Sequence, residues 1–303
     1  MSDHVAWLYL YPDLQRRLVE GKARFLSITC DVLRDAGWRV VIRDDSPEEL
    51  ALAAERPGFA LVRMIAPPAA GGLVFRRGYL KPFWHIERSA ERWNWPVAQA
   101  AFDPGTVKKD KADHFYARLK RRTFADVTPH QGGYVLMPLQ GKLNQQRGFQ
   151  SMSPLEMVET VLNNDPRPLR ITLHPRETYS EAELSALERL TQRHSHATVS
   201  LGGSDALLAG CDYVATQNSS VAFKGFLLGK PAALFARSDF HHIAACVHDL
   251  GAAEALRQAA TMTPDFAAYL WWFLRGHAIN EKRPDAALRI RQALARGGWP
   301  GLD

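Results

Sequence analysis

Three polar clusters in the second half of the sequence carry residue types that suit the binding of an anion. They are His174 with Arg176, then Ser200, Gly202, Gly203 and Ser204, then Asn218, Ser219, Ser220 and Lys224. Histidine, arginine and lysine side chains donate charge-assisted hydrogen bonds to phosphate oxygens. Free N–H groups at a helix N-terminus also favour negative charge. Together the clusters predict a site for a phosphate-bearing ligand.

Each cluster taken alone also has a purely structural interpretation. Ser219 could do no more than cap a helix. His174 followed by Pro175 is typical of a turn, and Gly202-Gly203 is typical of a tight connection. The ligand hypothesis therefore depends on whether the three clusters meet at one edge of one sheet.

The elements that must position these clusters alternate along the chain. Apolar runs at 134–139, 169–173, 197–200, 213–216 and 232–235 are predicted strands, and helices are predicted at 154–162, 180–193, 204–209 and 219–228. Strands alternating with helices indicate a parallel, doubly wound sheet. In such sheets ligands bind at the carboxyl ends of the strands, which is where the three clusters fall.

The first third shows the same alternation. Strands are predicted at 5–10, 39–42 and 59–64, and a helix at 17–36. The segment from Pro67 to Pro104 is rich in aromatics, proline and glycine and is predicted to be irregular, which in a compact domain usually indicates function. A basic amphipathic helix is predicted from 108 to 124.

A length of 303 residues favours two domains. We expect an N-terminal α/β domain at 1–130 on the side of an acceptor substrate, a ligand-binding α/β domain at 131–240, and C-terminal helices at 241–303 packing across both. The predicted fold class is thus α/β with two Rossmann-like domains and C-terminal helices.

The composition places the chain among soluble proteins of a reducing compartment. No apolar run reaches the length of about 18 to 20 residues that spans a bilayer, and the N-terminus does not resemble a signal peptide. Three widely spaced cysteines, Cys30, Cys211 and Cys246, argue against a disulfide framework and a zinc site. We therefore expect a cytoplasmic protein without a metal.

The excess of 38 Lys+Arg over 32 Asp+Glu is concentrated on a few predicted helices. The stretch Lys108–Arg122 could meet an acidic glycan or the inner membrane surface, or it could be a solvated helix face. No aromatic-interleaved basic motif accompanies it, so nucleic acid is not an expected partner.

Several sequence blocks resemble the capsular polysaccharide biosynthesis family, which includes β-Kdo transferases of capsule and lipopolysaccharide assembly. The resemblance covers roughly residues 134–297 well and the first third in outline. The blocks are His174-Pro175, Ser204-Asp205-Ala206-Leu207-Leu208, the run from Cys211 to Ser220, Leu228-Gly229-Lys230-Pro231, and the tail segments 269–274 and 279–284.

This resemblance implies a GT-B-type glycosyltransferase whose donor is a nucleotide sugar, with CMP-Kdo as the first candidate. By position it assigns His174, Ser219 and Ser220 to the donor phosphate, while Gln140 ends the strand that opens the donor-site loop. The implied acceptor is a glycan or a lipid-linked glycan. No cofactor beyond the donor co-substrate is expected, because histidine, serine and the helix dipole can meet the phosphate charge.

One departure from the family pattern concerns the catalytic base. The family carries acidic residues after this glutamine, but the loop at 140–149 contains no carboxylate. An inverting transfer needs a base for the acceptor hydroxyl. Glu87 is the predicted substitute, with His85 on the same face of an extended segment. Glu87 could instead be an ion-pair partner of Arg88 or Arg92.

Two other functions remain open at this point. The chain could be a non-catalytic nucleotide- or glycan-binding protein of polysaccharide assembly that keeps the fold and lacks the base. It could also be another GT-B-type enzyme such as a nucleotide-sugar epimerase, although such enzymes usually carry more acidic residues in the cleft.

Overall fold

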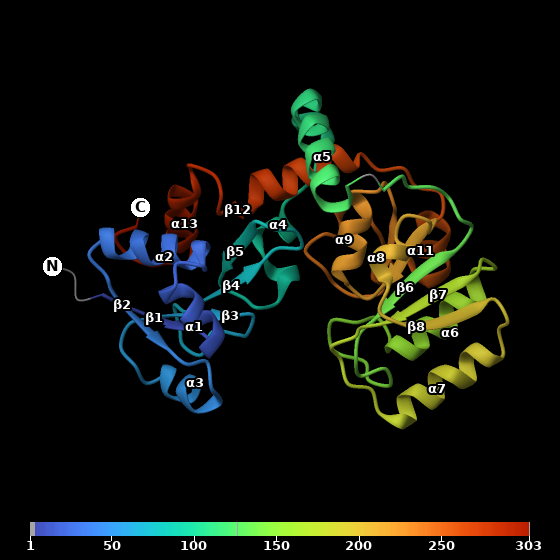
Figure 1. Ribbon diagram of the computed structural model, residues 1–303, viewed down its shortest axis with the longest axis horizontal. Coiled ribbons are helices and arrows are strands. Elements are labelled where there is room, and N and C mark those ends of the chain that lie inside the picture. Colours follow the sequence, from blue (N-terminus) through green and yellow to red (C-terminus); the bar gives the residue numbers. More distant parts are fainter. Residues whose placement is uncertain (1–3, 126, 303) are drawn as a thin grey trace. The chain divides into compact units, whose positions relative to one another are not determined.

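A computed structural model describes residues 4–125 and 127–302, and Figure 1 labels many of their elements. The chain forms two compact units. Unit 1 contains the chain up to Gln99 and returns from Phe273 onward, whereas unit 2 is Ala100–Trp272. The division therefore differs from the predicted boundaries at 130 and 240. The reason is that helix α5 (Lys109–Phe124) packs on α12 (Phe266–Trp271), with Phe115 edge-on to Trp271 at 5.5 Å, within unit 2.

Unit 1 is built on a mixed sheet of six strands in the order β12-β5-β4-β3-β1-β2. The strands are β1 (Val5–Tyr9), β2 (Arg39–Arg43), β3 (Phe59–Arg63), β4 (Leu73–Arg77), β5 (Phe83–Glu87) and β12 (Ile279–Asn280). Strands β1 to β4 pair in parallel, while β5 runs antiparallel to β4 and to β12. The three strands predicted in this region are confirmed.

The helices of unit 1 cover this sheet with apolar faces. They are α1 (Pro12–Val19), α2 (Arg24–Asp35), α3 (Pro47–Ala53), the 3-10 turn at Arg92–Asn94, α4 (Pro96–Gln99) and α13 (Ala286–Arg296). The prediction of a single helix at 17–36 is wrong. The helix is interrupted between α1 and α2 at Gly21, whose φ is 69°. Phe25 and Leu33 of α2 share a core with Ile290 of α13.

The aromatic segment predicted to be irregular contains the antiparallel pair β4 and β5. Phe75 and Phe83 are buried. Trp84 stacks on Phe25 at 4.5 Å and donates a hydrogen bond of 2.9 Å from its Nε1 to Glu281. These aromatic side chains are therefore in the core of unit 1, and the prediction of an irregular segment is wrong over these strands.

Unit 2 is built on an all-parallel sheet in the order β11-β10-β9-β6-β7-β8. The strands are β6 (Val135–Leu139), β7 (Leu169–Leu173), β8 (Ala197–Leu201), β9 (Tyr213–Thr216), β10 (Ala232–Leu234) and β11 (Ala245–Cys246). Numbered from β6, this order is the 3-2-1-4-5-6 arrangement of the Rossmann fold. Its topological switch point lies between β6 and β9, where ligands bind at the carboxyl ends.

Two helices of unit 2 begin with capping boxes that can be recognised in the sequence. The helices of this unit are α5, α6 (Pro154–Asn164), α7 (Glu181–Gln192), α8 (Ser204–Leu207), α9 (Ser220–Phe226), α10 (Val247–Leu250), α11 (Ala252–Ala259) and α12, with 3-10 turns at Pro104–Thr106 and His241–Ile243. A π-helix at Trp272–His277 follows. Capping boxes begin α6 at Ser153 with Glu156 and α7 at Ser180 with Glu183.

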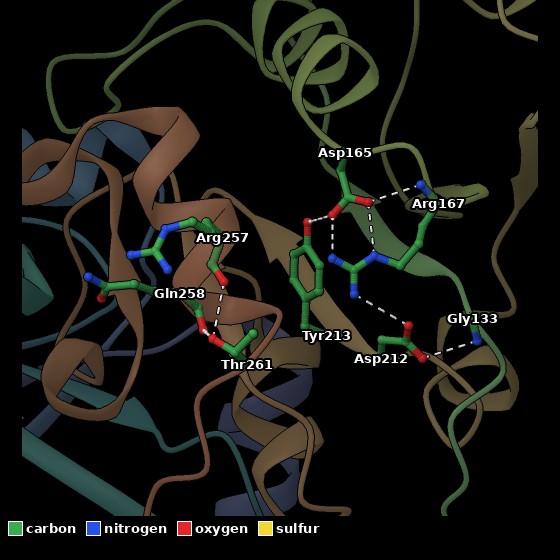
Figure 2. A network of polar contacts seen from close by, with 8 residues as sticks. All are labelled: Gly133, Asp165, Arg167, Asp212, Tyr213, Arg257, Gln258 and Thr261. Atoms are coloured by element: carbon green, nitrogen blue, oxygen red, sulfur yellow. Dashed lines mark hydrogen bonds and ion pairs between the residues drawn. The ribbon is translucent and has the colours of Figure 1, made fainter.

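A buried polar network ties together the segments at the amino ends of β6, β7 and β9 (Figure 2). Asp165 accepts hydrogen bonds from Arg167 at 2.8 and 2.9 Å and from the Tyr213 hydroxyl at 2.7 Å. Arg167 also contacts Asp212, which accepts from the backbone N–H of Gly133. Burial works to raise the pKa of Asp165, but the bonds from Arg167 and Tyr213 hold it below its usual value.

Candidate functional site

The carboxyl ends of the central strands of unit 2 lie level with one another. Leu139, Leu173 and Leu201 are register partners across β6, β7 and β8. The residues that follow them, Gln140, His174 and Gly202, therefore begin three neighbouring loops at one edge of the sheet. On the other side of β6, Thr216 at the end of β9 donates a hydrogen bond of 3.2 Å to Pro138 O. The three clusters thus follow β7, β8 and β9 of a single sheet, in which β6 lies between β7 and β9.

The turn after β7 presents His174 with a defined proton position. The backbone N–H of Arg176 donates to His174 Nδ1 at 3.2 Å, so Nδ1 is an acceptor and the neutral ring carries its proton on Nε2. The backbone N–H of His174 donates to the Tyr179 hydroxyl at 2.8 Å. His174 and Arg176 are both exposed. The ring can therefore offer an Nε2–H donor to an anion in solvent.

The segment after β9 combines a capping serine with an exposed one. Ser219 is the N-cap of α9 and accepts from the backbone N–H of Val221 at 3.2 Å, as the structural interpretation predicted. Ser220 is exposed. Asn218 is buried, and its Nδ2 donates to Arg237 O at 3.0 Å, so this side chain holds the loops together. Only the serines have hydroxyls near the surface here.

The remaining predicted donor-site residues are engaged within the protein. Lys224 Nζ contacts both carboxylate oxygens of Asp205, at 2.8 and 2.9 Å. Ser204 Oγ lies 2.7 Å from Thr172 Oγ1, and Ser200 Oγ donates to Gly202 O at 3.3 Å. Gly203 has a φ of 82°, which requires glycine-like freedom at the start of α8. These residues shape the edge of the sheet.

The loop after β6 runs along the carboxyl edge from the β7 side to β10. On the β7 side, the Leu143 backbone N–H donates to Glu183 at 2.5 Å. Bonds from the backbone N–H groups of Ser180 and Leu143 help to lower the pKa of Glu183. At the other end, Gln150 forms an antiparallel bridge with Ala236 and the backbone N–H of Ser151 donates to Phe235 O at 2.8 Å. Gln140, at the start of this loop, is exposed.

Sequence reasoning did not single out Glu177, which the fold brings to this loop. A Cβ placed on Gly141 would lie 2.7 Å from Glu177 Oε2, so the carboxylate sits against the Gly141 backbone. The only signal in the sequence is that Glu177 follows His174 by three residues in the same turn. A carboxylate is therefore present at the carboxyl edge of this sheet although the loop after β6 contains none.

Glu87 and His85 lie in unit 1, on the same face of β5. His85 Nδ1 is 3.7 Å from Glu87 Oε1, which is beyond hydrogen-bonding distance. The His85 ring is 2% exposed and packs on Trp95 at 4.7 Å. Glu87 lines a pocket of about 400 Å³ whose other polar lining residues are Arg88, Ser89, Asn94 and Arg296. Glu87 can thus contact a ligand in this pocket of unit 1 directly, whereas His85 is buried and cannot.

One group of potential metal ligands occurs among the described residues. Cys246, His248 and Asp249 bring one ligand atom each within 4.8 Å of one another. Burial raises the pKa of the Cys246 thiol to about 12, and metal binding requires the thiolate. His248 Nε2 lies 2.9 Å from Asp249 and can pair with it without an ion. The donor set does not suit a resident metal.

Comparisons with known proteins support the fold assignment. No model of a known protein family matches the chain, and no curated protein matches it. Among solved structures, the β-Kdo 2,7 transferase KpsC of Thermosulfurimonas dismutans matches 97% of this chain and 99% of its own, with a TM-score of 0.55 and 12% sequence identity. This chain shares its fold with KpsC. A β-Kdo 2,4 transferase KpsC structure from the same organism matches 89% of each chain with a TM-score of 0.47 and 14% identity.

The likeness to KpsC extends over both units. Together with one mixed and one all-parallel sheet, each flanked by helices, it confirms the predicted α/β fold class of GT-B type. At 12% identity the likeness to KpsC concerns the fold alone. The assignment of individual residues must therefore come from the geometry of the sheet edge.

Proposed function

We propose that this protein is an inverting glycosyltransferase of capsule or surface polysaccharide assembly. In this proposal it transfers a sugar from a nucleotide-activated donor, with CMP-Kdo as the first candidate, to a glycan or lipid-linked glycan. The observation that supports the proposal is that His174 and Arg176 follow β7 while Ser219 and Ser220 follow β9, the two strands that flank β6 in a Rossmann sheet, in a chain with the fold of KpsC.

The donor phosphate would be bound by a small set of side chains in unit 2. His174 would donate from Nε2, Arg176 would add a positive charge, and the hydroxyls of Ser219 and Ser220 would donate from the start of α9. The hydrogen bonds from these groups strengthen as negative charge develops on the leaving phosphate in the transition state. This stabilisation of the transition state would lower the barrier to sugar transfer. The proposal needs no metal, because these donors meet the phosphate charge.

The acceptor would use unit 1. Its pocket offers the Glu87 carboxylate, the Asn94 amide and the Arg88 and Arg296 guanidinium groups. Carboxylates and amides accept and donate hydrogen bonds with sugar hydroxyls, and the arginines suit an acidic sugar. This assignment keeps Glu87 as the sequence-predicted functional residue of unit 1.

Nucleotide binding tests the first half of the proposal. We expect CMP, CDP or UDP to bind unit 2 of the intact chain, because the switch point gathers donors for a phosphate. Isothermal titration calorimetry with each nucleotide measures this. No heat, together with no shift in melting temperature at millimolar concentrations of any of the three, would contradict the proposal.

A second function is favoured by one observation. The loop at 140–149 contains no carboxylate, which would suit a non-catalytic nucleotide- or glycan-binding protein of polysaccharide assembly. Release of CMP from CMP-Kdo in the absence of an acceptor discriminates the two, because many transferases slowly hydrolyse their donors. Binding without any release above the buffer rate favours the binding protein.

The basic face of helix α5 supports a proposed contact with the membrane surface. The buried face of this helix, with Phe115 and Leu119, packs within unit 2, while Lys111, Arg118 and Arg121 are exposed. The described helices include none that has both the length and the apolarity to cross a bilayer. We therefore propose peripheral contact of α5 with the cytoplasmic surface of the inner membrane, through anionic lipid headgroups.

Replacing two of these cations should weaken binding to anionic vesicles. Each exposed lysine or arginine near a membrane contributes about 1 kcal/mol, so Lys111→Ala with Arg118→Ala should lower affinity for phosphatidylglycerol vesicles about thirtyfold. Cosedimentation measures this. Arg257→Ala is the matched control, since Arg257 is already paired with Glu254. If the double variant binds the vesicles as tightly as the wild type, or if wild-type binding persists at about 0.5 M NaCl, the basic face of α5 does not bind the membrane and is a solvated surface instead.

A further inference from the structure

The position of Glu177 is fixed by the same turn that presents His174. The backbone N–H of Glu177 donates to His174 O at 3.1 Å, which closes the turn that follows β7. The Tyr179 hydroxyl accepts from the backbone N–H of His174 at 2.8 Å and holds the turn from its other side. Burial, with the neighbouring charges of Glu177 and Glu183, raises the pKa of Tyr179, so this hydroxyl stays neutral. Glu177 therefore cannot move far from His174.

The carboxylate of Glu177 folds back against the loop that follows β6. A Cβ on Gly141 would lie 2.7 Å from Glu177 Oε2 and 3.4 Å from Glu177 Cβ. Any side chain at position 141 would consequently displace the carboxylate. Two residues further on, the bond from Leu143 N to Glu183 anchors the loop to the start of α7. Glycine at 141 lets Glu177 lie beside β6, which borders the switch point.

Two other carboxylates near this edge are already paired within the protein. Glu183 accepts from the backbone N–H groups of Ser180 and Leu143, and Asp205 holds Lys224. Glu177 is exposed, and no hydrogen bond or ion pair with its carboxylate is found in the described parts of the chain, 4–125 and 127–302. Its oxygens are thus available to a ligand that reaches the carboxyl ends of β6 and β7.

We propose that Glu177, rather than Glu87, is the base of the transfer reaction; this rests on the proposed function. The acceptor oxygen forms a bond to the anomeric carbon of the donor sugar while the bond from that carbon to the nucleotide phosphate oxygen breaks. The bonding electron pair leaves with the phosphate, which His174, Ser219 and Ser220 stabilise. The acceptor proton passes to the Glu177 carboxylate and then to solvent.

The position of Glu177 relative to the donor edge supports this assignment over Glu87. The phosphate-binding residues and Glu177 belong to one compact unit, and the turn that carries His174 also carries Glu177. A base must reach the attacking oxygen while the donor is bound. Because one turn carries both His174 and Glu177, the distance between the phosphate-binding group and the base is fixed. Glu87 then serves the pocket of unit 1 as a ligand-binding residue.

The test uses the intact chain, CMP-Kdo as donor and water as acceptor. Glu177→Gln keeps the shape of the side chain and removes its basicity, so CMP release should fall at least about a hundredfold, the lower end of general-base effects. Affinity for CMP should stay within about twofold, because Glu177 is not placed on the phosphate. Gly141→Ala should also slow CMP release, because the added methyl displaces the carboxylate.

Two matched variants separate this role from a general effect of charge. Glu181→Gln makes the same change on an exposed residue at the start of α7 and should leave CMP release unchanged. Glu87→Gln tests the alternative base in unit 1 through the same measurement of CMP release, with CMP affinity as its control.

The outcomes distinguish this inference from the proposed function. If wild-type protein binds CMP and releases it from CMP-Kdo, and Glu177→Gln releases it at a near wild-type rate, Glu177 is not the base. If Glu87→Gln loses the activity with CMP affinity intact, the base is in unit 1. If the wild type neither binds CMP nor releases it, the proposed function fails before the inference is reached.

Discussion

Replacing His174 with alanine is expected to weaken CMP binding about tenfold to a hundredfold. A hydrogen bond to a charged group contributes roughly 1.5 to 3 kcal/mol, and each 1.4 kcal/mol is a tenfold change in affinity. The bond from Arg176 N to His174 Nδ1 leaves the proton on Nε2, so the lost group is a donor aimed at solvent. The double variant Ser219→Ala/Ser220→Ala should have an effect of similar size. Isothermal titration calorimetry with CMP measures both.

The controls for this experiment come from the same edge of the sheet. Lys224→Ala should change affinity for CMP little, because Asp205 already holds the ammonium group. All variants should melt close to the wild type, since His174 and Ser220 are exposed. If the His174 and serine variants bind CMP with wild-type affinity, these residues only form the turn after β7 and cap α9. A large drop in melting temperature would show that they are structural.

Most strands of both units could be predicted because they are short apolar runs bounded by polar residues. The runs at 169–173 and 213–216 match β7 and β9 residue for residue. In a parallel sheet the buried strand reads as a continuous apolar run, and β6 and β9 are buried throughout. The positions of His174 and Ser219 after strands followed from these runs, and so did the prediction that they share an edge.

The β4 and β5 pair could not be recognised in the same way. Its strands mix arginines with aromatics, and the glycine and proline between them made the segment look irregular. Only the packing of Trp84 on Phe25, which lies 59 positions earlier in the printed sequence, shows that these rings belong to the core. The unit boundary was hidden for a similar reason, because Phe115 finds its partner Trp271 only in the folded chain.

The carboxylate of the donor edge was missed because it depends on contacts between loops. Glu177 and Gly141 follow different strands, and nothing in either loop alone reports their approach. Likewise, Lys224 looks like a phosphate ligand in the sequence, whereas its partner Asp205 lies on another helix. Sequence periodicity indicates which strands carry functional loops, but the pairing of side chains between loops requires the sheet order and register.

Asp165→Ala is expected to destabilise unit 2 by about 3 kcal/mol, the lower end of the range for breaking a buried ion pair. Asp165 has a side-chain exposure of 3% and holds Arg167 and the buried hydroxyl of Tyr213 (Figure 2). Alanine would leave that hydroxyl without its acceptor and Arg167 with the longer contact to Asp212 alone. Tyr213→Phe, which removes one bond of the same network, should cost only about 1 kcal/mol. Denaturant unfolding at neutral pH measures both variants.

The contribution of Asp165 to the free energy of unfolding depends on pH in a predictable direction. Because the folded-state pKa of Asp165 is lowered, its stabilisation is present above the unfolded value of about 3.9 and is lost as the pH falls through the folded-state pKa. The difference in free energy of unfolding between wild type and Asp165→Ala should therefore be constant from about pH 7 to 5 and shrink below about pH 4. CMP affinity should not change, since the network joins the amino ends of β6, β7 and β9 and the proposed donor site lies at their carboxyl ends. A difference that instead grows toward low pH would mean that Asp165 is not held as a carboxylate by Arg167.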